Sequence, residues 1–212
     1  MAMASRPKIT CLPNGPYSLS DEGGAQVTRS SGETFATTGK ASLCRCGGSS
    51  SKPFCDGTHR KKGFRDDNTA DPAKNKRIAY AGKRITIFDN RAVCAHAGHC
   101  TDGLAAVFRH HDTPWIEPDG AAVNEIVAVI KKCPSGALSY AIEGIEARPP
   151  QRAPKVTVTD NGPYEVAGGI ELEGVQFGDG APRGHYTLCR CGASKNKPFC
   201  DGSHWDAKFR DP

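Results

Sequence analysis

Residues 43–59 read LCRCGGSSSKPFCDGTH, and residues 188–204 read LCRCGASKNKPFCDGSH. Each copy holds three cysteines and one histidine in the spacing C-x-C-x8-C-x3-H. The candidate metal ligands are Cys44, Cys46, Cys55 and His59 in the first copy and Cys189, Cys191, Cys200 and His204 in the second. Three thiolates and one imidazole favour zinc or an iron–sulfur cluster over magnesium or calcium, which prefer oxygen ligands.

The duplication extends beyond these ligands. Residues 14–17 read NGPY and recur at residues 161–164, so the repeat covers roughly 8–64 and 155–209. Apolar and polar residues alternate around both NGP turns, which is typical of short antiparallel strands. Between NGPY and the first cysteine the two copies differ in length by two residues. Such a difference is typical of a surface loop.

The size of the repeat predicts how the two copies are arranged. A unit of this length has little core of its own, so we expect the copies to pair face to face about a pseudo-twofold axis. The predicted fold class is α+β, with two β-rich units in an intramolecular pair and a small ferredoxin-like α+β unit. The predicted domains are residues 1–64, 76–145 and 155–212, and we expect a monomer because the pairing needs no second subunit.

The repeated motif resembles that of the CDGSH iron–sulfur family. Both copies match every fixed position of C-x-C-x2-[S/T]-x3-P-x-C-D-G-[S/T/A]-H. The resemblance covers about half of the chain and implies one [2Fe–2S] cluster per copy, two in all. It also implies that two cysteines hold the inner iron and that a cysteine and the histidine hold the outer iron. The inner pairs are then Cys44 with Cys46 and Cys189 with Cys191, and the outer pairs Cys55 with His59 and Cys200 with His204.

Structural zinc is the competing interpretation of these motifs. Zinc sites usually separate paired cysteines by two to four residues, whereas one residue separates each first pair here. Spacing alone leaves zinc open. For an iron–sulfur site, replacing one thiolate by neutral imidazole makes the cluster less negative and easier to reduce.

The region between the repeats predicts a different unit. We expect a strand at residues 84–90, an amphipathic helix through residues 123–130 and a closing strand at 137–143. The expected order of elements is strand, helix, strand, helix, strand.

This middle unit carries three further cysteines. Cys94, Cys100 and Cys133 resemble the ferredoxin pattern C-x2-C-x2-C…C-P, with Ala97 in place of the central cysteine. Three thiolates can hold a [3Fe–4S] cluster, and a fourth ligand from His96 or His99 would allow a [4Fe–4S] cluster. A ferredoxin-like domain without a cluster is the alternative. Cys11 alone is left without a partner motif, and we expect it to pack in the core.

Composition limits the kinds of partner the protein is expected to bind and indicates its cellular location. The net charge of +5 lacks the dense basic stripe of nucleic-acid binders, so we expect no nucleic acid. No run approaches the ~18 apolar residues of a membrane span, and the first residues lack the apolar core of a signal peptide. We therefore expect the protein to be cytoplasmic and not to associate with a membrane. Ten cysteines in a reducing compartment indicate metal ligands before disulfides.

The favoured function is electron transfer with a redox partner. Storage of iron–sulfur clusters, or their transfer to an apo acceptor protein, is an alternative, and a zinc-stabilised interaction module is an alternative of another class. The chain has no G-x-G-x-x-G or P-loop pattern and no nucleophile–base signature, so we predict that it is not an enzyme.

Histidine ligation predicts sensitivity to acid. Imidazole binds metal only when neutral, and its ordinary pKa is about 6.5, so protons compete with iron below neutral pH. We expect visible absorbance to fall on acidification, and the double variant His59→Cys, His204→Cys to keep its colour to a lower pH. Bleaching of both proteins at the same pH would rule out histidine ligation.

Overall fold

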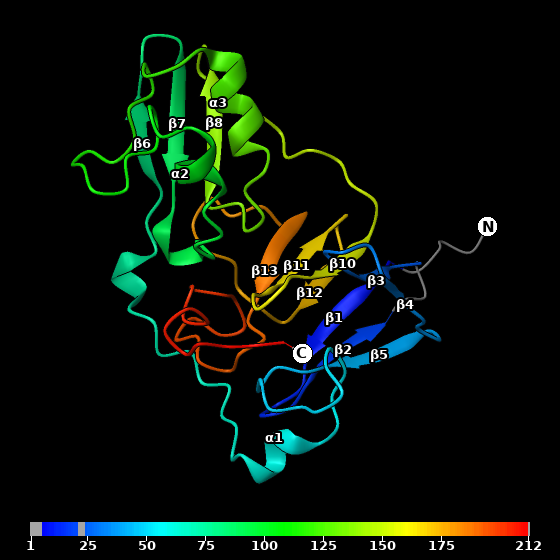
Figure 1. Ribbon diagram of the computed structural model, residues 1–212. Helices are drawn as coiled ribbons and strands as arrows, with labels where there is room; N and C mark the ends of the chain where they lie inside the picture. Colours follow the sequence, from blue (N-terminus) through cyan, green and yellow to red (C-terminus); the bar gives the residue numbers. More distant parts are fainter. Residues whose placement is uncertain (1–5, 21–23, 212) are drawn as a thin grey trace.

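The computed structural model describes residues 6–20 and 24–211 of the chain, whose strands form three sheets (Figure 1). Two sheets belong to the repeats and one to the middle unit, which confirms the predicted α+β class. Within the described residues, no helix has the length and apolar character that crossing a membrane requires.

The first repeat builds a sheet in the order β12-β1-β2-β5. Its own strands are β1 (Lys8–Cys11), β2 (Tyr17–Ser20) and β5 (Lys40–Leu43). The outer strand, β12 (Glu171–Glu173), comes from the second repeat and runs parallel to β1, with Ile9 opposite Leu172.

The second repeat builds the matching sheet in the order β13-β11-β10-β3-β4. Its own strands are β10 (Lys155–Val158), β11 (Tyr164–Ala167) and β13 (His185–Leu188). The first repeat supplies β3 (Gln26–Arg29) and the short β4 (Thr34–Phe35), and β3 runs parallel to β10 with Val27 opposite Val156. The first repeat therefore gives two strands to the sheet of the second repeat and receives one strand in return.

This exchange corrects the prediction of a surface loop between NGPY and the cysteines. In both repeats that segment holds the exchanged strand, β3 or β12, and Val27 on β3 is fully buried. The segment in which the two repeats differ in length therefore contains the strand that pairs one repeat with the other. The pairing itself is confirmed, although it occurs through shared sheets as well as through facing surfaces.

The two repeats share one apolar core. Its members come from both sheets, and the rings of Tyr17 and Tyr164 meet edge to face with centroids 6.1 Å apart. Cys11 packs against this core, as expected. Neither repeat could keep this core alone, because each side of it is covered by the other.

The middle unit has its own sheet, in the order β6-β7-β8-β9, and its own core. Its elements are β6 (Ile78–Ala81), β7 (Ile85–Asp89), α2 (His99–Gly103), α3 (Val123–Ile130), β8 (Leu138–Ile142) and β9 (Ile145–Glu146), with 3-10 helices at Pro72–Lys74 and Arg91–Val93. The structure confirms the strand at 84–90, the helix at 123–130 and the strand at 137–143.

The predicted order of elements in this unit was wrong. No strand separates α2 from α3 in the described chain; a single bridge joins Phe108 to Ile116. Pro114 and Pro118 lie in this stretch and have no N–H to donate to a ladder, so a longer strand is disfavoured.

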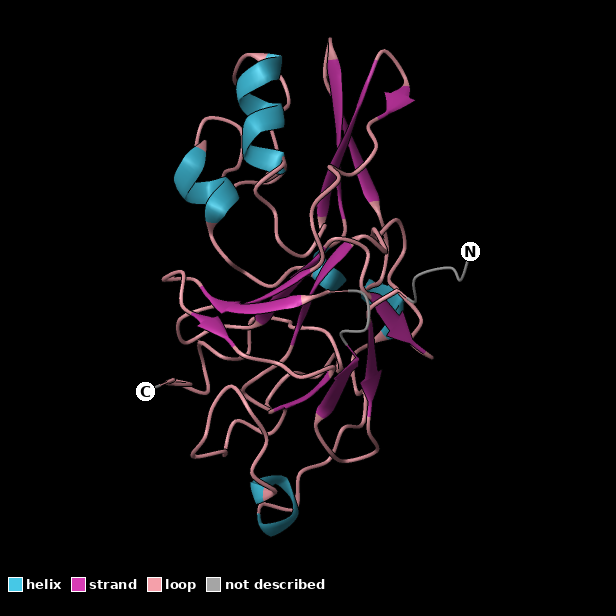
Figure 2. Ribbon diagram, turned by 90° about the vertical axis from the view of Figure 1, so that its right-hand side faces the viewer, coloured by secondary structure: helices cyan, strands magenta, loops and turns pink. Residues whose placement is uncertain are grey.

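The middle unit rests on the second repeat. Asn90 donates through Nδ2 to the carbonyl oxygen of Asp179 at 2.9 Å, and the backbone N–H of Arg77 donates to Oδ2 of the same residue at 3.1 Å. The short helix α1 (Thr58–Lys61) lies at the opposite end of the molecule in both views (Figures 1 and 2).

The shared core predicts a large cost for one truncation. Leu19 lies fully buried in it, so Leu19→Ala should lower the free energy of unfolding by about 2–5 kcal/mol. Leu12 is 40% exposed, and Leu12→Ala should change it by no more than about 0.5 kcal/mol. Denaturant unfolding of both variants measures the difference, and equal costs would contradict the shared core.

Candidate metal centres

In the first repeat, the end of a strand brings the predicted ligands together. Cys44 follows β5 directly, and an antiparallel bridge from Leu43 to Phe54 returns the chain so that Cys55 lies beside it. The Sγ atoms of Cys44 and Cys46 are 3.8 Å apart. Sγ of Cys55 lies 3.3 Å from Nδ1 of His59 in α1.

The second repeat forms the same arrangement. Cys189 follows β13, and the bridge from Leu188 to Phe199 places Cys200 beside it. The Sγ atoms of Cys189 and Cys191 are 3.7 Å apart, and Sγ of Cys200 lies 3.4 Å from Nδ1 of His204. The structure thus groups the eight predicted ligands into four close pairs.

A serine of each motif braces the loop that connects its two ligand pairs. The Ser49 hydroxyl donates to the carbonyl oxygen of Phe54 at 2.6 Å, and Ser194 donates to Phe199 at 2.7 Å. Lys52 also donates through Nζ to the carbonyl oxygen of Ser49. Serine and lysine therefore hold the loop shut around the ligands.

Backbone N–H groups point at several of the sulfurs. Gly48 donates to Sγ of Cys46, Gly57 donates to Sγ of Cys55, and Ala193 donates to Sγ of Cys191, each at 3.4 Å. Such bonds stabilise thiolate charge and tune iron–sulfur centres. Soft donors in close pairs, with N–H groups aimed at the sulfur, fit an iron–sulfur cluster. Among the described residues, no three His, Cys, Asp or Glu side chains converge as they would on one metal ion.

The aspartate of each motif ties its loop to the histidine segment. Oδ2 of Asp56 accepts from the Ser50 N–H and Oδ1 accepts from the Thr58 N–H, both at 2.9 Å. These bonds hold the pKa of Asp56 well below its ordinary value. Burial raises the pKa of Asp201, but hydrogen bonds from Ser203 and Lys195 outweigh it and leave that pKa lowered as well.

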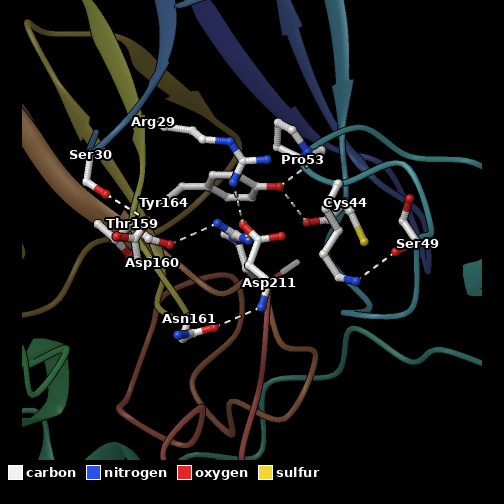
Figure 3. Close-up of polar contacts among 12 residues, drawn as sticks. Arg29, Ser30, Cys44, Ser49, Pro53, Thr159, Asp160, Asn161, Tyr164 and Asp211 are labelled. Carbon is white, nitrogen blue, oxygen red and sulfur yellow. Dashed lines mark hydrogen bonds and ion pairs between the residues drawn. The ribbon is translucent and has the colours of Figure 1, made fainter. Parts of the chain in front are cut away.

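Two buried tyrosines connect each repeat to the metal site of the other. The Tyr17 hydroxyl donates to the carbonyl oxygens of Cys189 and Pro198, at 3.0 and 2.9 Å. The Tyr164 hydroxyl donates to those of Cys44 and Pro53, at 3.1 and 2.9 Å (Figure 3). Each cysteine loop is therefore held from across the pseudo-twofold axis.

Each site also holds an ion pair of a buried arginine that was not among the predicted site residues. Arg45 lies between two ligands, is buried, and donates through Nη2 to Oδ2 of Asp66 at 3.1 Å. Its counterpart Arg190 pairs with Asp211, which also accepts from Arg29 at 3.3 Å (Figure 3). The signal was present, because both copies read C-R-C and then F-R-D downstream.

The three cysteines of the middle unit line one cavity of about 180 Å³. His96, His99 and Ala97 line the same cavity, so neither histidine is separated from the thiols. The N–H of His96 donates to Sγ of Cys94 at 3.4 Å. Burial raises the pKa of Cys94 to about 11 and also raises that of Cys100, and a bound cation would reverse this by stabilising the thiolates. The residues fit a cluster held by three thiolates.

Comparison with known proteins supports both kinds of centre. The family model described as "Iron-binding zinc finger CDGSH type" matches residues 14–60 and 161–205, and that described as "Divergent 4Fe-4S mono-cluster" matches residues 80–143. "Uncharacterized protein YjdI" of Escherichia coli (strain K12) is 44% identical over 61 residues, or 29% of this chain and 80% of the relative. The protein of the same name from Escherichia coli O157:H7 has the same values. No solved structure matches the chain significantly.

The crossed tyrosines predict an effect on the metal sites. Tyr17→Phe and Tyr164→Phe each leave a buried cysteine carbonyl without its donor, which should cost about 1–3 kcal/mol of stability. We expect both variants to lose iron to a chelator faster than the parent protein, because the cysteine loop loosens.

Tyr186→Phe is the matched control for this experiment. Its hydroxyl is also buried, but it donates to the carbonyl oxygen of Ile170, outside the metal loops. The control should lose similar stability and retain its iron. Equal iron loss in all three variants would show that general destabilisation, and not the crossed bonds, governs retention.

Proposed function

We propose that this chain is a multicentre electron carrier. The chain belongs to the CDGSH-type iron-binding family and carries a divergent 4Fe–4S domain between its two CDGSH units. The observation that supports this most is the grouping of eight soft ligands into four pairs at the ends of two equivalent strands. Each repeat offers two pairs, as two iron atoms of one cluster require.

The proposed ligand assignment follows the pairs. Cys44 and Cys46 would hold one iron of the first [2Fe–2S] cluster, and Cys55 and His59 the other. The second cluster would use the equivalent residues, which are Cys189, Cys191, Cys200 and His204. A bound [2Fe–2S] cluster supplies a one-electron acceptor, and the N–H groups aimed at the sulfurs favour its reduced, more negative state.

A third cluster is part of the proposal. Cys94, Cys100 and Cys133 line one cavity, which supports a [3Fe–4S] cluster or, with His96 or His99 as a fourth ligand, a [4Fe–4S] cluster. The match to a divergent 4Fe–4S family supports the same assignment.

Donation of clusters to an apo acceptor is the second candidate. It is favoured by one observation, the partial exposure of Cys55 and His59, which leaves that pair accessible from solvent. Reversible reduction without loss of iron would support electron transfer, and movement of iron to an apo-ferredoxin would support donation. Both functions use a protein partner and no substrate chemistry of the chain itself, so we keep the proposal that the protein is not an enzyme. Its cytoplasmic location and monomeric state stay predictions.

Metal analysis of anaerobically purified protein tests the proposal. Two [2Fe–2S] clusters predict about four irons and four sulfides per chain, and a third cluster raises the count to about seven or eight irons. We expect a red-brown protein with signals of reduced clusters in electron paramagnetic resonance. A colourless protein that contains zinc and no sulfide would reject the proposal.

Single substitutions assign the iron to its sites. Cys46→Ser and Cys191→Ser should each remove about two irons, and Cys133→Ser should remove those of the third cluster alone. Cys11→Ser is the matched control, because Cys11 packs against the core and lies in no ligand pair. It should keep the full iron content.

A further inference from the structure

The two CDGSH sites have the same ligands but different surroundings. In the second site, Cys200 and His204 are buried, at 2% and 5% exposure. In the first site, Cys55 and His59 are only partly buried. The motif itself is nearly identical in both copies, so the difference comes from what covers each site.

The middle unit covers the second site. A Cβ placed on Gly202 would lie 2.7 Å from Cδ2 of His96, whereas one placed on Gly57, the equivalent residue, would meet nothing within 4 Å. Trp205 donates through Nε1 to the carbonyl oxygen of His96 at 3.3 Å. Asn196 donates through Nδ2 to that of Ala92 at 2.7 Å. The loop before α2 therefore lies directly against the histidine side of the second site.

The first site opens instead on a groove. This groove runs past His59, and its apolar lining includes Leu12, Pro13, Pro16 and Phe64. Leu12 is 40% exposed, although leucine is usually buried. The second repeat has Thr159 and Asp160 in place of Leu12 and Pro13, so its counterpart lacks this apolar character.

Basic residues lie in and next to the segment that lines the groove. Arg60 and Arg65 line it, and Lys61 and Lys62 follow in the same segment; all four are exposed. Among the ion pairs of residues 6–20 and 24–211, none involves Arg60 or Lys61, and Arg65 pairs only with the exposed Asp67, at 3.4 Å. The corresponding segment of the second repeat begins Trp205-Asp206-Ala207 and has no such cluster.

We infer that the groove beside His59, with Arg60 and Arg65 in its lining, is the docking surface for a protein with an acidic surface, and that the middle unit closes the second site to such a partner. An apolar floor with a charged rim is the usual anatomy of a protein interface, and the opposite charge of the partner would guide its approach. The inference rests on the proposed function, since the docked protein would exchange electrons or a cluster at the first site. The second site then serves exchange within the chain.

Binding of an acidic apo-ferredoxin to the full-length protein tests this inference. We expect salt-sensitive binding, and the double variant Arg60→Glu, Arg65→Glu should weaken it by about tenfold or more at low ionic strength. The difference should disappear near 1 M salt, where charges are screened beyond about 3 Å. Leu12→Ser should weaken binding at both salt concentrations, because it removes apolar contact.

Arg210→Glu is the matched control, because Arg210 is the counterpart of Arg65 beside the second site. It should leave binding within about twofold of the parent protein. Equal weakening by Arg65→Glu and Arg210→Glu, or no binding by the parent protein at low salt, would overturn the docking surface. Tighter binding of a DNA duplex, with the same arginine dependence, would also overturn it in favour of nucleic acid.

Iron and sulfide are measured on every variant. If the variants keep their iron and substitution of Arg60 and Arg65 leaves binding unchanged, the docking surface is wrong and the proposed function is unaffected. A parent protein without iron or sulfide defeats the proposed function, while the binding experiment still reports on the surface.

Discussion

Each half of the duplicated fold completes a sheet of the other half, and the rest of the structure depends on this exchange. β3 joins the second repeat beside β10, and β12 joins the first repeat beside β1. Val27 and Leu172, on the exchanged strands, are both buried, and such side chains contribute about 1.5–3 kcal/mol each. Two units too small to fold well alone thereby form a single core.

The exchange also determines how the metal sites are held. The ligands follow β5 and β13, so their positions depend on complete sheets. The hydroxyls of Tyr17 and Tyr164 then cross the axis to the cysteine loop of the other repeat. Since a metal bound to the folded state stabilises it, occupation of one site should support the whole pair and not one repeat alone.

The middle unit breaks the symmetry that the duplication creates. It packs on the second repeat through Asn90 and Arg77, and its His96 loop covers the second metal site. The first site, at the far end near α1, keeps an open histidine side (Figures 1 and 2). Nearly identical motifs thus occupy two environments, one facing the chain itself and one facing solvent.

Much of this protein was readable from its sequence, because metal ligation and helix periodicity leave local patterns. The ligand pairs, the CDGSH resemblance and the helix at 123–130 depend on residues close together in the chain. The absence of a strand between α2 and α3 in the described chain also has a local cause, because Pro114 and Pro118 in this stretch disfavour a strand. The ion pairs Arg45–Asp66 and Arg190–Asp211 have a signal in the repeated C-R-C and F-R-D, but nothing in the sequence indicates that both arginines are buried.

The contacts between segments that are distant in the sequence were decided only by the tertiary structure. The exchanged strands differ from the predicted surface loop, because a strand of three or four residues carries little periodicity and its partner in the other repeat lies more than a hundred residues away. The hydrogen bonds of the crossed tyrosines and the packing of His96 against Gly202 also join residues that are far apart in the sequence. The sequence by itself determined the candidate metal ligands, which the fold brings into close pairs in each repeat. Packing determined that the two sites differ, because burial depends on neighbours that no local pattern specifies.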